Sequence, residues 1–430
     1  MTDASSVVIR PAKNIAGSLR LPGDKSISHR YAMLAGLAEG RTRLENFSTG
    51  ADCASTLGCM RALGCKVVRN GGKVEIEGVG CALHAPAGPL DCGNSGSTMR
   101  MLSGIVAGQE FSSEMIGDAS LSRRPMARII KPLRQMGASI ESNGDRPPLR
   151  IHGGKLKAIE YTLPVASAQV KSCLLFAGLL AEGETRVEEP LRTRDHSELA
   201  LRAFGAEVKS CGKNRWSIRG GQKLHAIEAL VPGDISTSAF FLCAAALFPG
   251  SDLVFDNLLL NPTRAALLDV LTALGMRIQV LRVEERHGEL TGTVQVRYGA
   301  LKGATIAGAQ SAALIDELPV LSAIAPFTKE GIEIRDAREL RVKESDRISA
   351  VVTNLRAMGA EVEEREDGLR VPGNQKLHGA ELNSYDDHRI AMAFAVAALR
   401  ATGESRIIGA DAARISFPEF FTTLEGLVQR

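Results

Sequence analysis

The chain is poor in aromatic residues, which make up 4% of its 430 residues and include a single tryptophan. It also lacks long apolar runs, because the longest, AFFLCAAALF and IAMAFAVAAL, reach ten residues, whereas a membrane-spanning helix needs about 20. No positively charged segment followed by an apolar one opens the sequence, so no signal peptide is predicted. We therefore expect a cytoplasmic protein that does not bind membranes.

Neither sign of charge dominates the chain. Lys and Arg number 52 and Asp and Glu 49, a net charge of +3, which gives no basis for a nucleic-acid-binding surface. The eight cysteines include no CxxC motif and no paired Cys/His spacing, which argues against a zinc site or a disulfide framework. His388 beside Asp386 and Asp387 lacks a third clustered ligand, so no metal site is predicted.

What the sequence does contain is an internal repeat. The segments MRALGCKV, LRQMGASI, LRAFGAEV, LTALGMRI and LRAMGAEV share one pattern, a helix end closed by glycine and followed by a strand. A second series of helices is interleaved with the first, and strand-turn-strand signals such as KVVRNGGKVEIEG follow the first series. Chance similarity between amphipathic helices is the alternative, but the even spacing of the two series favours a helix-strand-helix-hairpin repeat of about 70 residues.

Six repeats predict an α/β protein made of two similar domains. The sixth repeat lacks its hairpin, because the chain stops four residues after Gly426, and the N-terminal stretch SSVVIRPAKNIAGSLRLPG is a strand-turn-strand without a repeat of its own. We expect the N-terminal stretch to complete the sixth repeat. Residues 22–230 would then form one domain with repeats one to three, and residues 1–21 with 231–430 a discontinuous second domain.

Cations gather where helices are expected to begin. In LPGDKSISHR, for example, Lys25 and Arg30 fall in the first turns of an expected helix, where the helix dipole already favours anions. The full set is Lys25, Arg30, Arg124, Lys171, Arg194, Lys343, Arg347 and Arg389. Each alone could be a solvated surface charge, but together they indicate a bound anion that balances both the side chains and the free backbone N–H groups.

Two carboxylates stand among these cations. Asp316 lies in LIDELP, and Glu344 lies in RVKESDR between Lys343 and Arg347. A carboxylate beside fixed cations can serve as a base, or as an acid when it is transiently protonated, although a structural salt bridge is the alternative for either residue. The glycine-rich GNSGSTMR could let backbone N–H groups approach an oxyanion, but it lacks the P-loop spacing.

These motifs, in order along nearly the whole chain, resemble those of the 5-enolpyruvylshikimate-3-phosphate synthase (3-phosphoshikimate 1-carboxyvinyltransferase) family. The matching stretches are LPGDKSISHR, GNSGSTMR, SLSRRPM, SAQVKS, RTRDHSE, LIDELPVL, RVKESDR and DDHRIAM. The resemblance implies a transferase of aromatic amino-acid biosynthesis that moves the enolpyruvyl group of phosphoenolpyruvate to the 5-hydroxyl of shikimate 3-phosphate and releases phosphate. It also implies a monomer without cofactor, built as an inside-out α/β barrel with pseudo-six-fold repeats, whose domains close over a cleft that holds the active site.

The resemblance assigns roles to individual residues. Asp316 would accept the 5-hydroxyl proton, Glu344 would protonate the methylene carbon, and Lys25 would contact both substrates. The residues implied for shikimate 3-phosphate are Lys25, Ser26, Arg30, Ser167, Ala168, Gln169, Arg194, Asp316 and Lys343. Those implied for phosphoenolpyruvate are Lys25, Asn94, Gly96, Arg124, Gln169, Arg347 and Arg389, the last two on its carboxylate.

Two positions depart from the family pattern. Ile415 stands where many members carry a Lys, and Arg414 is a candidate substitute. Position 96 is Gly where some glyphosate-tolerant members carry Ala, so we expect room for glyphosate in the phosphoenolpyruvate pocket.

Two alternative functions are weighed against this one, a related enzyme and a binding protein without catalytic activity. The sister family, UDP-N-acetylglucosamine enolpyruvyl transferase, carries a cysteine where this chain has Ala119. A non-catalytic anion-binding repeat protein, the reading from another class, would not need Asp316 and Glu344.

Overall fold

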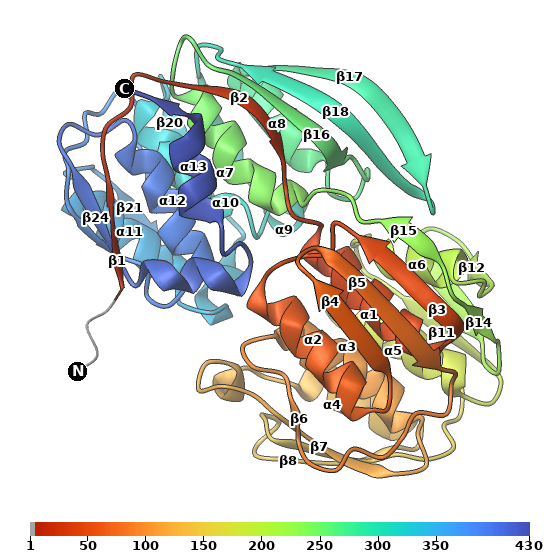
Figure 1. The fold of residues 1–430 in the computed structure, drawn as a ribbon. Helices are drawn as coiled ribbons and strands as arrows, with labels where there is room; N and C mark the ends of the chain where they lie inside the picture. The colour runs from red at the N-terminus through yellow and green to blue at the C-terminus, as the bar shows by residue number, and fades with distance from the viewer. Residues whose placement is uncertain (1–4) are drawn as a thin grey trace. The chain divides into compact units, whose positions relative to one another are not determined.

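The computed structural model describes residues 5–430 and divides into two compact units (Figure 1). Unit 1 contains the described residues up to Leu21 together with Gly233–Glu284 and Leu290–Arg430. Unit 2 contains Pro22–Pro232 and, in addition, the short segment Glu285–Glu289. That segment joins two long strands of unit 1, a detail that the repeat pattern did not indicate.

Unit 2 contains three repeats of helix, strand, helix and hairpin. The first consists of α1 (Lys25–Leu37), β3 (Ala38–Glu45), α2 (Ala51–Ala62), β4 (Lys66–Asn70) and β5 (Lys73–Val79). The second consists of β6 (Leu90–Asp91), α3 (Gly96–Ala107), β7 (Ser112–Ile116), η1 (Leu121–Arg123), α4 (Ala127–Gln135), β8 (Ser139–Ser142) and β9 (Leu149–His152). The third consists of β10 (Glu160–Thr162), α5 (Ala168–Leu180), β11 (Glu184–Glu188), α6 (His196–Ala203), β12 (Val208–Ser210), β13 (Arg215–Arg219), β14 (Leu224–His225) and β15 (Glu228–Leu230).

The sheets of unit 2 link its repeats into a ring. Each sheet pairs its central strand with the repeat's own antiparallel hairpin and, on the other side, with a short parallel strand that follows the hairpin of the preceding repeat in the chain, as in β6-β7-β9-β8 and β10-β11-β13-β12. The strand β14, which ends the third repeat, returns to pair in parallel with β3 of the first. No repeat of unit 2 is therefore left with an unpaired central strand on that side.

Unit 1 repeats the same pattern. Its first part consists of β1 (Ser6–Ile9), β2 (Asn14–Arg20), α7 (Ile235–Ala246), β16 (Asp252–Leu259), α8 (Ala266–Leu274), β17 (Arg277–Arg286), β18 (Glu289–Arg297), β19 (Gly303–Ile306) and α9 (Ala309–Ala313). The next repeat consists of α10 (Leu318–Ile324), η2 (Ala325–Phe327), β20 (Gly331–Ile334), η3 (Arg338–Val342), α11 (Arg347–Ala357), β21 (Glu363–Arg365) and β22 (Gly368–Val371). The last consists of β23 (Glu381–Asn383), α12 (His388–Ala398), β24 (Ser405–Ile408), η4 (Ala410–Ile415), α13 (Phe420–Leu427) and β25 (Val428–Gln429).

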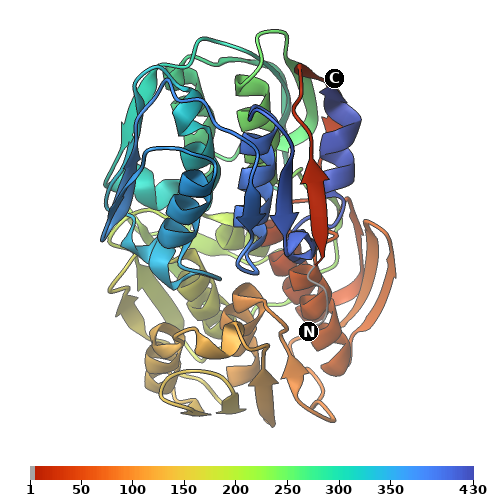
Figure 2. The same ribbon diagram turned by 90° about the vertical axis from the view of Figure 1, so that its left-hand side faces the viewer.

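The N-terminal strands join two repeats of unit 1. As expected from the missing hairpin, β1 pairs antiparallel with β24 of the sixth repeat, where Val7 faces Ile407, and it lies beside the last strands in Figure 2. The start of β2 pairs with β25. The rest of β2, however, runs parallel to β16 of the fourth repeat. Thus β2 plays the part in unit 1 that β14 plays in unit 2, a link that the sequence did not indicate.

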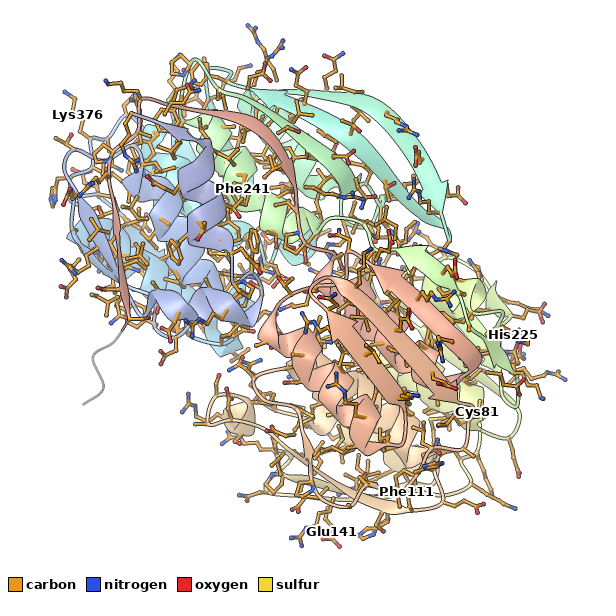
Figure 3. All side chains as sticks on the ribbon, in the orientation of Figure 1. Cys81, Phe111, Glu141, His225, Phe241 and Lys376 are labelled. Carbon is orange, nitrogen blue, oxygen red and sulfur yellow. The ribbon has the colours of Figure 1, made fainter. Side chains whose placement is uncertain are left out.

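Three inner helices form the core of each unit, namely α1, α3 and α5 in unit 2 and α7, α10 and α12 in unit 1. All residues of α1 from Ile27 onward are buried, and all residues of α12 are. Helices buried all round need no polar face, which explains their runs of Ala and Leu. In unit 1, α7 also contributes Phe241 (labelled in Figure 3), whose ring centroid lies 5.6 Å from that of Phe420 in α13.

The mixed α/β class is confirmed, whereas the finer architecture is not. The strands of residues 5–430 pair into six separate sheets, and their pairings do not describe a closed barrel, so the inside-out barrel stays a prediction. None of the helices within this range is long and apolar enough to cross a membrane.

Candidate functional site

The helices that carry the site begin at polar N-cap side chains. Asp24 accepts a hydrogen bond from the Ile27 N–H at 2.9 Å, and Ser95 accepts one from the Thr98 N–H at 3.1 Å. Asp234, Asp346 and Asp387 cap α7, α11 and α12 in the same way. A cap of this kind satisfies one of the four N–H groups that a helix start leaves free, so the others remain available to an anion.

The cation at the start of α1 is partly balanced by the protein itself. Lys25 Nζ lies 3.0 Å from Asp52 Oδ2, and Asp52 belongs to the first turn of α2. The side chain of Lys25 remains 18% exposed. The bound anion expected at this helix start would therefore share the balance of the Lys25 charge with a carboxylate from the neighbouring helix.

Arg30 is held from several sides in unit 2. Its guanidinium donates to Ser197 Oγ at 2.6 Å, to Ser172 Oγ at 2.7 Å and to the Ser26 carbonyl at 2.8 Å. The pKa of Arg30 is lowered to about 10, mainly by burial; the charge of Glu198 opposes this shift and the positive charge of Arg194 adds to it. Because the two positive charges repel each other, a bound anion beside them is favourable.

The start of α3 brings together four residues that were predicted to bind phosphoenolpyruvate. Asn94 Oδ1 accepts a hydrogen bond from Arg124 at 2.8 Å, and Arg124 is 8% exposed. A Cβ atom placed on Gly96 would lie 3.4 Å from Arg124 Nη1 and 2.9 Å from Nη1 of Arg100. Arg100 in turn donates to Gln169 Oε1 at 2.8 Å. Arg100 thus joins this group, although the sequence analysis did not select it.

Ser167 and Ala168 begin α5 in the same unit. Ser167 is the N-cap residue, and its hydroxyl accepts a hydrogen bond from the Val170 N–H at 3.4 Å. Ala168 is the first helical residue, so its N–H is one of the groups that the helix itself does not satisfy. Gln169 follows and donates to Ser97 Oγ at 2.8 Å, which connects the starts of α5 and α3.

Lys171 does not belong with the anion-binding cations. Its ammonium group is fully buried and lies 2.8 Å from Glu189 and 2.6 Å from Glu198. Both partners come from later in the third repeat, so the spacing around Lys171 did not indicate them. The interpretation that Lys171 faces a ligand is wrong, because two internal carboxylates already balance its charge.

Arg347 is the centre of the site residues in unit 1. Its buried guanidinium donates to Asp387 Oδ2 at 2.8 Å and to Glu344 Oε2 at 2.6 Å. Its Nη1 lies 3.5 Å from Asp316 Oδ1. Although burial opposes the charge, these carboxylates together raise the pKa of Arg347 above its ordinary value, so the group stays protonated.

Arg389 and Lys343 complete this group. Arg389 donates to the Asp316 carbonyl at 2.8 Å and lies 3.8 Å from Asp316 Oδ1. The pKa of Lys343 is lowered, mainly because the protein removes it from water and although the charge of Asp316 acts in the opposite direction. The two predicted carboxylates and three predicted cations of unit 1 therefore form one cluster, in which Asp316 and Glu344 are 20% and 17% exposed.

Several predicted helix starts shift in the structure. Arg124 was expected at a helix start, but it has an extended backbone after η1, and both it and Pro125 precede α4, which begins at Ala127. A residue before proline is disfavoured in the helical region, which explains the difference. Arg194 likewise lies before α6, whose N-cap is Asp195, and Lys343 lies before α11.

Asp387, like Arg100, is a functional candidate that the sequence analysis did not select. It is fully buried, and it also accepts hydrogen bonds from Ser345 Oγ at 3.1 Å and from the Arg389 N–H at 2.9 Å. Its place just before an expected helix was a signal for an N-cap, but its contact with Arg347, 40 residues earlier, was not readable from spacing. Between residues 5 and 430, no group of three His, Cys, Asp or Glu side chains could hold a metal ion.

The structure also shows where the residues that depart from the family pattern lie. Arg414 is exposed in η4, and Ile415 beside it is half-buried. Ala119, where the sister family carries a cysteine, is exposed in the turn between β7 and η1.

The fold and these clusters define a class of protein, namely a repeat-built α/β protein whose helix starts carry arginine and lysine side chains suited to small anions. Comparison with known proteins is more specific. The family model of EPSP synthase (3-phosphoshikimate 1-carboxyvinyltransferase) matches residues 9–424. The chain belongs to this family.

Individual relatives match this chain over nearly its full length. The chain is 65% identical to the 3-phosphoshikimate 1-carboxyvinyltransferase of Koribacter versatilis, a match that covers 99% of the chain and 100% of that protein. It is 57% identical to the protein of the same name from Solibacter usitatus, over 98% of the chain and 99% of the relative. The solved EPSP synthase of Acinetobacter baumannii superposes with a TM-score of 0.88 at 42% identity and covers 98% of both chains.

Proposed function

We propose that this chain catalyses the transfer of the enolpyruvyl group of phosphoenolpyruvate to the 5-hydroxyl of shikimate 3-phosphate, with release of phosphate. The observation that carries the proposal is the cluster around Arg347, where two partly exposed carboxylates lie among three cations, in a chain of this family. A protein that only binds anions has no need of both carboxylates.

The proposed anion sites follow from the arginine and lysine side chains. Arg347 and Arg389 hold the carboxylate of phosphoenolpyruvate, because a guanidinium offers a planar fork that matches a carboxylate. Lys25, Asn94, Gly96, Arg124 and Gln169 hold its phosphate end. Lys25, Ser26, Arg30, Ser167, Ala168, Gln169, Arg194 and Lys343 hold shikimate 3-phosphate.

Asp316 and Glu344 carry the proton transfers in this proposal. Asp316 takes the proton of the 5-hydroxyl of shikimate 3-phosphate while the hydroxyl oxygen forms a bond to C2 of phosphoenolpyruvate. Glu344 gives a proton to the methylene carbon C3. The tetrahedral intermediate then loses phosphate from C2 and a proton from the new methyl group, which leaves the enol ether. Lys25, Arg124 and Arg347 stabilise the negative charge throughout.

Residues of both units contribute to one active site in this proposal, in a cleft that closes when the substrates bind. The monomeric state and the cytoplasmic location are parts of the same proposal. The first rests on the family resemblance alone, and the second is supported by the short apolar runs. No metal or organic cofactor takes part in the proposed steps.

The test is an assay of phosphate release with phosphoenolpyruvate and either shikimate 3-phosphate or UDP-N-acetylglucosamine. We expect release with shikimate 3-phosphate alone. Release only with the sugar nucleotide would identify the sister activity, and release with neither would support a non-catalytic binding protein.

Two variants test the proposed proton transfers. Glu344→Gln and Asp316→Asn should each lower kcat at least about 100-fold, because a positioned acid or base contributes about 10²–10⁴. Glu366→Gln is the matched control, since that carboxylate pairs with Arg338 on the surface at 77% exposure. Equal kcat values in the three variants would contradict the roles of Asp316 and Glu344.

A further inference from the structure

A row of buried hydrogen bonds connects α1, α2 and α3 in unit 2. His29 Nδ1 of α1 lies 2.7 Å from Thr56 Oγ1 of α2, and Thr56 Oγ1 lies 2.7 Å from Thr98 Oγ1 of α3. Thr98 Oγ1 then donates to Ser95 Oγ, the N-cap of α3, at 2.8 Å. All four side chains are fully buried. They form a buried bridge between the helices, and none of them has a part in the proposed reaction.

The hydrogens of the buried bridge point in one direction. Thr98 donates its hydroxyl hydrogen to Ser95, and its other acceptor, the Asp52 carbonyl at 3.4 Å, has no hydrogen to give. Thr56 must therefore donate to Thr98, and His29 must donate from Nδ1 to Thr56. His29 Nε2 has no hydrogen-bond partner among residues 5–430. This fits a nitrogen that carries no hydrogen, because a buried N–H without an acceptor is the rarer defect.

His29 serves as a neutral hydrogen-bond donor. Its pKa is lowered well below the ordinary value, mostly by burial and further by the positive charges of Lys25 and Arg30. The imidazole therefore stays uncharged near neutral pH and adds no third positive charge beside these two cations. A buried polar network in which each hydrogen has an acceptor fixes the positions of the groups that it joins.

Both ends of the buried bridge lie beside residues proposed to bind substrate. His29 lies one helical turn after Lys25. At the other end, Ser95 stands between Asn94 and Gly96. Asn94 and Gly96 are proposed to hold the phosphate end of phosphoenolpyruvate together with Lys25. The buried bridge thus connects the two helix starts that must meet this phosphate.

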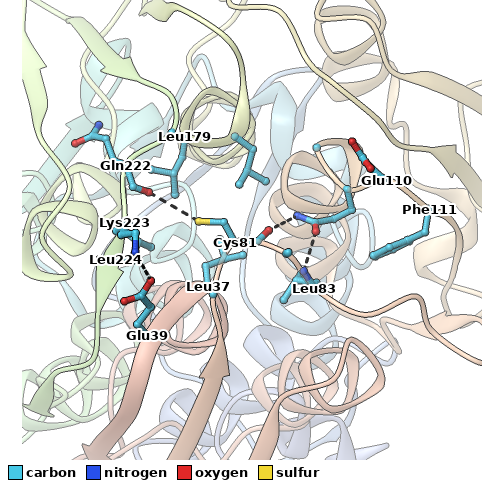
Figure 4. A pocket seen from close by; sticks show the side chains of 16 residues that line it. Leu37, Glu39, Cys81, Leu83, Glu110, Phe111, Leu179, Gln222, Lys223 and Leu224 are labelled. Carbon is cyan, nitrogen blue, oxygen red and sulfur yellow. Dashed lines mark hydrogen bonds and ion pairs between the residues drawn. The ribbon is translucent and has the colours of Figure 1, made fainter.

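The opposite ends of α1 and α3 constrain the two helices less. Leu37 and Gly108, where these helices end, line a cavity of about 600 Å³ (Figure 4). A cavity lacks the atom contacts that would fix two helices at one distance from each other. The placement of the two helix starts therefore depends on the hydrogen bonds near them.

The shikimate 3-phosphate residue next to His29 has supports of its own. Arg30 donates to Ser172 Oγ in α5 and to Ser197 Oγ in α6, and neither bond involves the buried bridge. Loss of the bridge should therefore disturb the start of α3 more than the position of Arg30.

We propose that His29, Thr56 and Thr98 are positioning residues for phosphoenolpyruvate. Through the N-cap Ser95 they hold the start of α3 where it meets the phosphate end of this substrate. The inference rests on the proposed function, because it concerns one substrate of that reaction.

Replacing the threonines by valine tests the bridge at nearly constant side-chain shape. Thr98→Val keeps the N-cap, since the cap bond uses the Thr98 backbone N–H. Thr98→Val and Thr56→Val should each raise the KM for phosphoenolpyruvate about two- to tenfold, as expected for the loss of a buried hydrogen bond. The KM for shikimate 3-phosphate and kcat should change less.

Thr185→Val is the matched control. Thr185 is also fully buried in unit 2, but its hydroxyl has no hydrogen-bond partner among residues 5–430. All three kinetic constants should stay unchanged in this variant. Equal KM values for phosphoenolpyruvate in Thr98→Val and Thr185→Val would overturn the proposal.

Changes at His29 separate positioning from general damage to the core. His29→Asn keeps a side-chain N–H donor and should retain most of the affinity for phosphoenolpyruvate, whereas His29→Leu should raise its KM as Thr56→Val does. The double variant of His29→Leu with Thr98→Val should raise the KM no more than the larger single effect, because either change breaks the same bridge. Multiplied single effects would show that the two residues act independently and would contradict the bridge.

NMR tests the bridge without the reaction. In protein labelled with ¹⁵N-histidine, one of the eight imidazoles should be neutral with its hydrogen on Nδ1. Its signals should be absent from His29→Asn and shifted in Thr56→Val. A His29 ring with its hydrogen on Nε2 would overturn the proposal even if a variant fails to fold.

The two proposals fail in different ways. If the unaltered protein releases no phosphate from phosphoenolpyruvate with shikimate 3-phosphate, the proposed function fails, and the positioning role fails with it. If it does release phosphate and Thr98→Val keeps the unaltered KM for phosphoenolpyruvate, the positioning role alone is wrong.

Discussion

Arg347 shows how one buried side chain can organise several others. Its guanidinium reaches Asp387, Glu344 and Asp316, which come from three separate stretches of the chain. Removing one partner of such a group leaves a buried charge unpaired, which typically costs about 3–5 kcal/mol. The arrangement therefore holds Glu344 and Asp316 at defined positions, as the proposed proton transfers require.

Gly96 carries the first prediction at this scale. Gly96→Ala should raise the inhibition constant of glyphosate about tenfold or more and the KM for phosphoenolpyruvate by less, because the added methyl group meets Arg100 at 2.9 Å and Arg124 at 3.4 Å. The flexible end of Arg100 can move, so kcat should change little. Inhibition kinetics on both enzymes measure this.

The control is Gly58→Ala, since nothing lies within 4 Å of a Cβ atom at Gly58. If millimolar glyphosate leaves the turnover of the unaltered enzyme unaffected, the expected room beside Gly96 does not exist.

Lys343 carries a second prediction, on pH dependence. Its pKa is lowered by desolvation, so as the pH rises its positive charge is lost earlier than that of an ordinary lysine. The KM for shikimate 3-phosphate should therefore rise on the alkaline side below pH 10.5. In Lys343→Arg the charge persists, because the guanidinium stays protonated, and this rise should disappear.

Initial rates between about pH 7 and 10 check this prediction. Lys376→Arg, a substitution in a loop of unit 1, is the control and should keep the alkaline rise. The same rise in Lys343→Arg would show that another group causes it.

At the scale of elements, the sequence predicts the inner helices and the hairpins but not which strands pair with one another between repeats. The start of α1 and the hairpins β4–β5 and β21–β22 follow from local signals, namely an N-cap residue, apolar spacing and turn residues. The partner strand of β14 lies in another repeat, and no local pattern encodes that choice.

The partners of Lys171 are likewise not encoded by a local pattern, and their contacts lead to a prediction about stability. Lys171→Met should lower the free energy of unfolding of unit 2 by about 3–5 kcal/mol near neutral pH, because Glu189 and Glu198 would be left buried without their cation. The single tryptophan, Trp216, lies with its ring centroid 5.8 Å from Lys171 Nζ, so urea unfolding followed by its fluorescence reports on this region.

The pH dependence of this variant has a definite sign. Burial raises the pKa of Glu198, so the folded state binds more protons than the unfolded state above the ordinary carboxyl pKa. The deficit in Lys171→Met should therefore shrink as the pH falls toward 5. Lys209→Met, at a side chain that is 60% exposed, is the control. A deficit below about 1 kcal/mol, or one independent of pH, would contradict the role of the buried pair.

At the scale of the whole molecule, both units are rings of three repeats, and unit 1 completes its ring with the N-terminal strand β2. In both rings, residues proposed to bind substrate lie at or just before the starts of inner helices. The proposed closure follows if the substrate anions bind to helix starts of both units at once.

Closure carries the last prediction. The radius of gyration measured by small-angle scattering should fall when shikimate 3-phosphate is added, because the ligand bridges the two sets of cations. Arg194→Gln, which removes a proposed phosphate contact, should need more ligand to reach the same change. Phosphate alone is the control, and an unchanged radius at saturating shikimate 3-phosphate would exclude closure by this substrate.

The sequence by itself determined the repeat, the helix ends and the order of the polar motifs, because these depend on residues a few positions apart. The tertiary structure decided which charges meet: Lys171 pairs with internal carboxylates, Arg347 with Asp387, and Lys25 partly with Asp52. It also decided that β2 closes the ring of unit 1. Ion pairs, strand partners and cavities join residues far apart along the chain, so only the packing of the folded protein could select them.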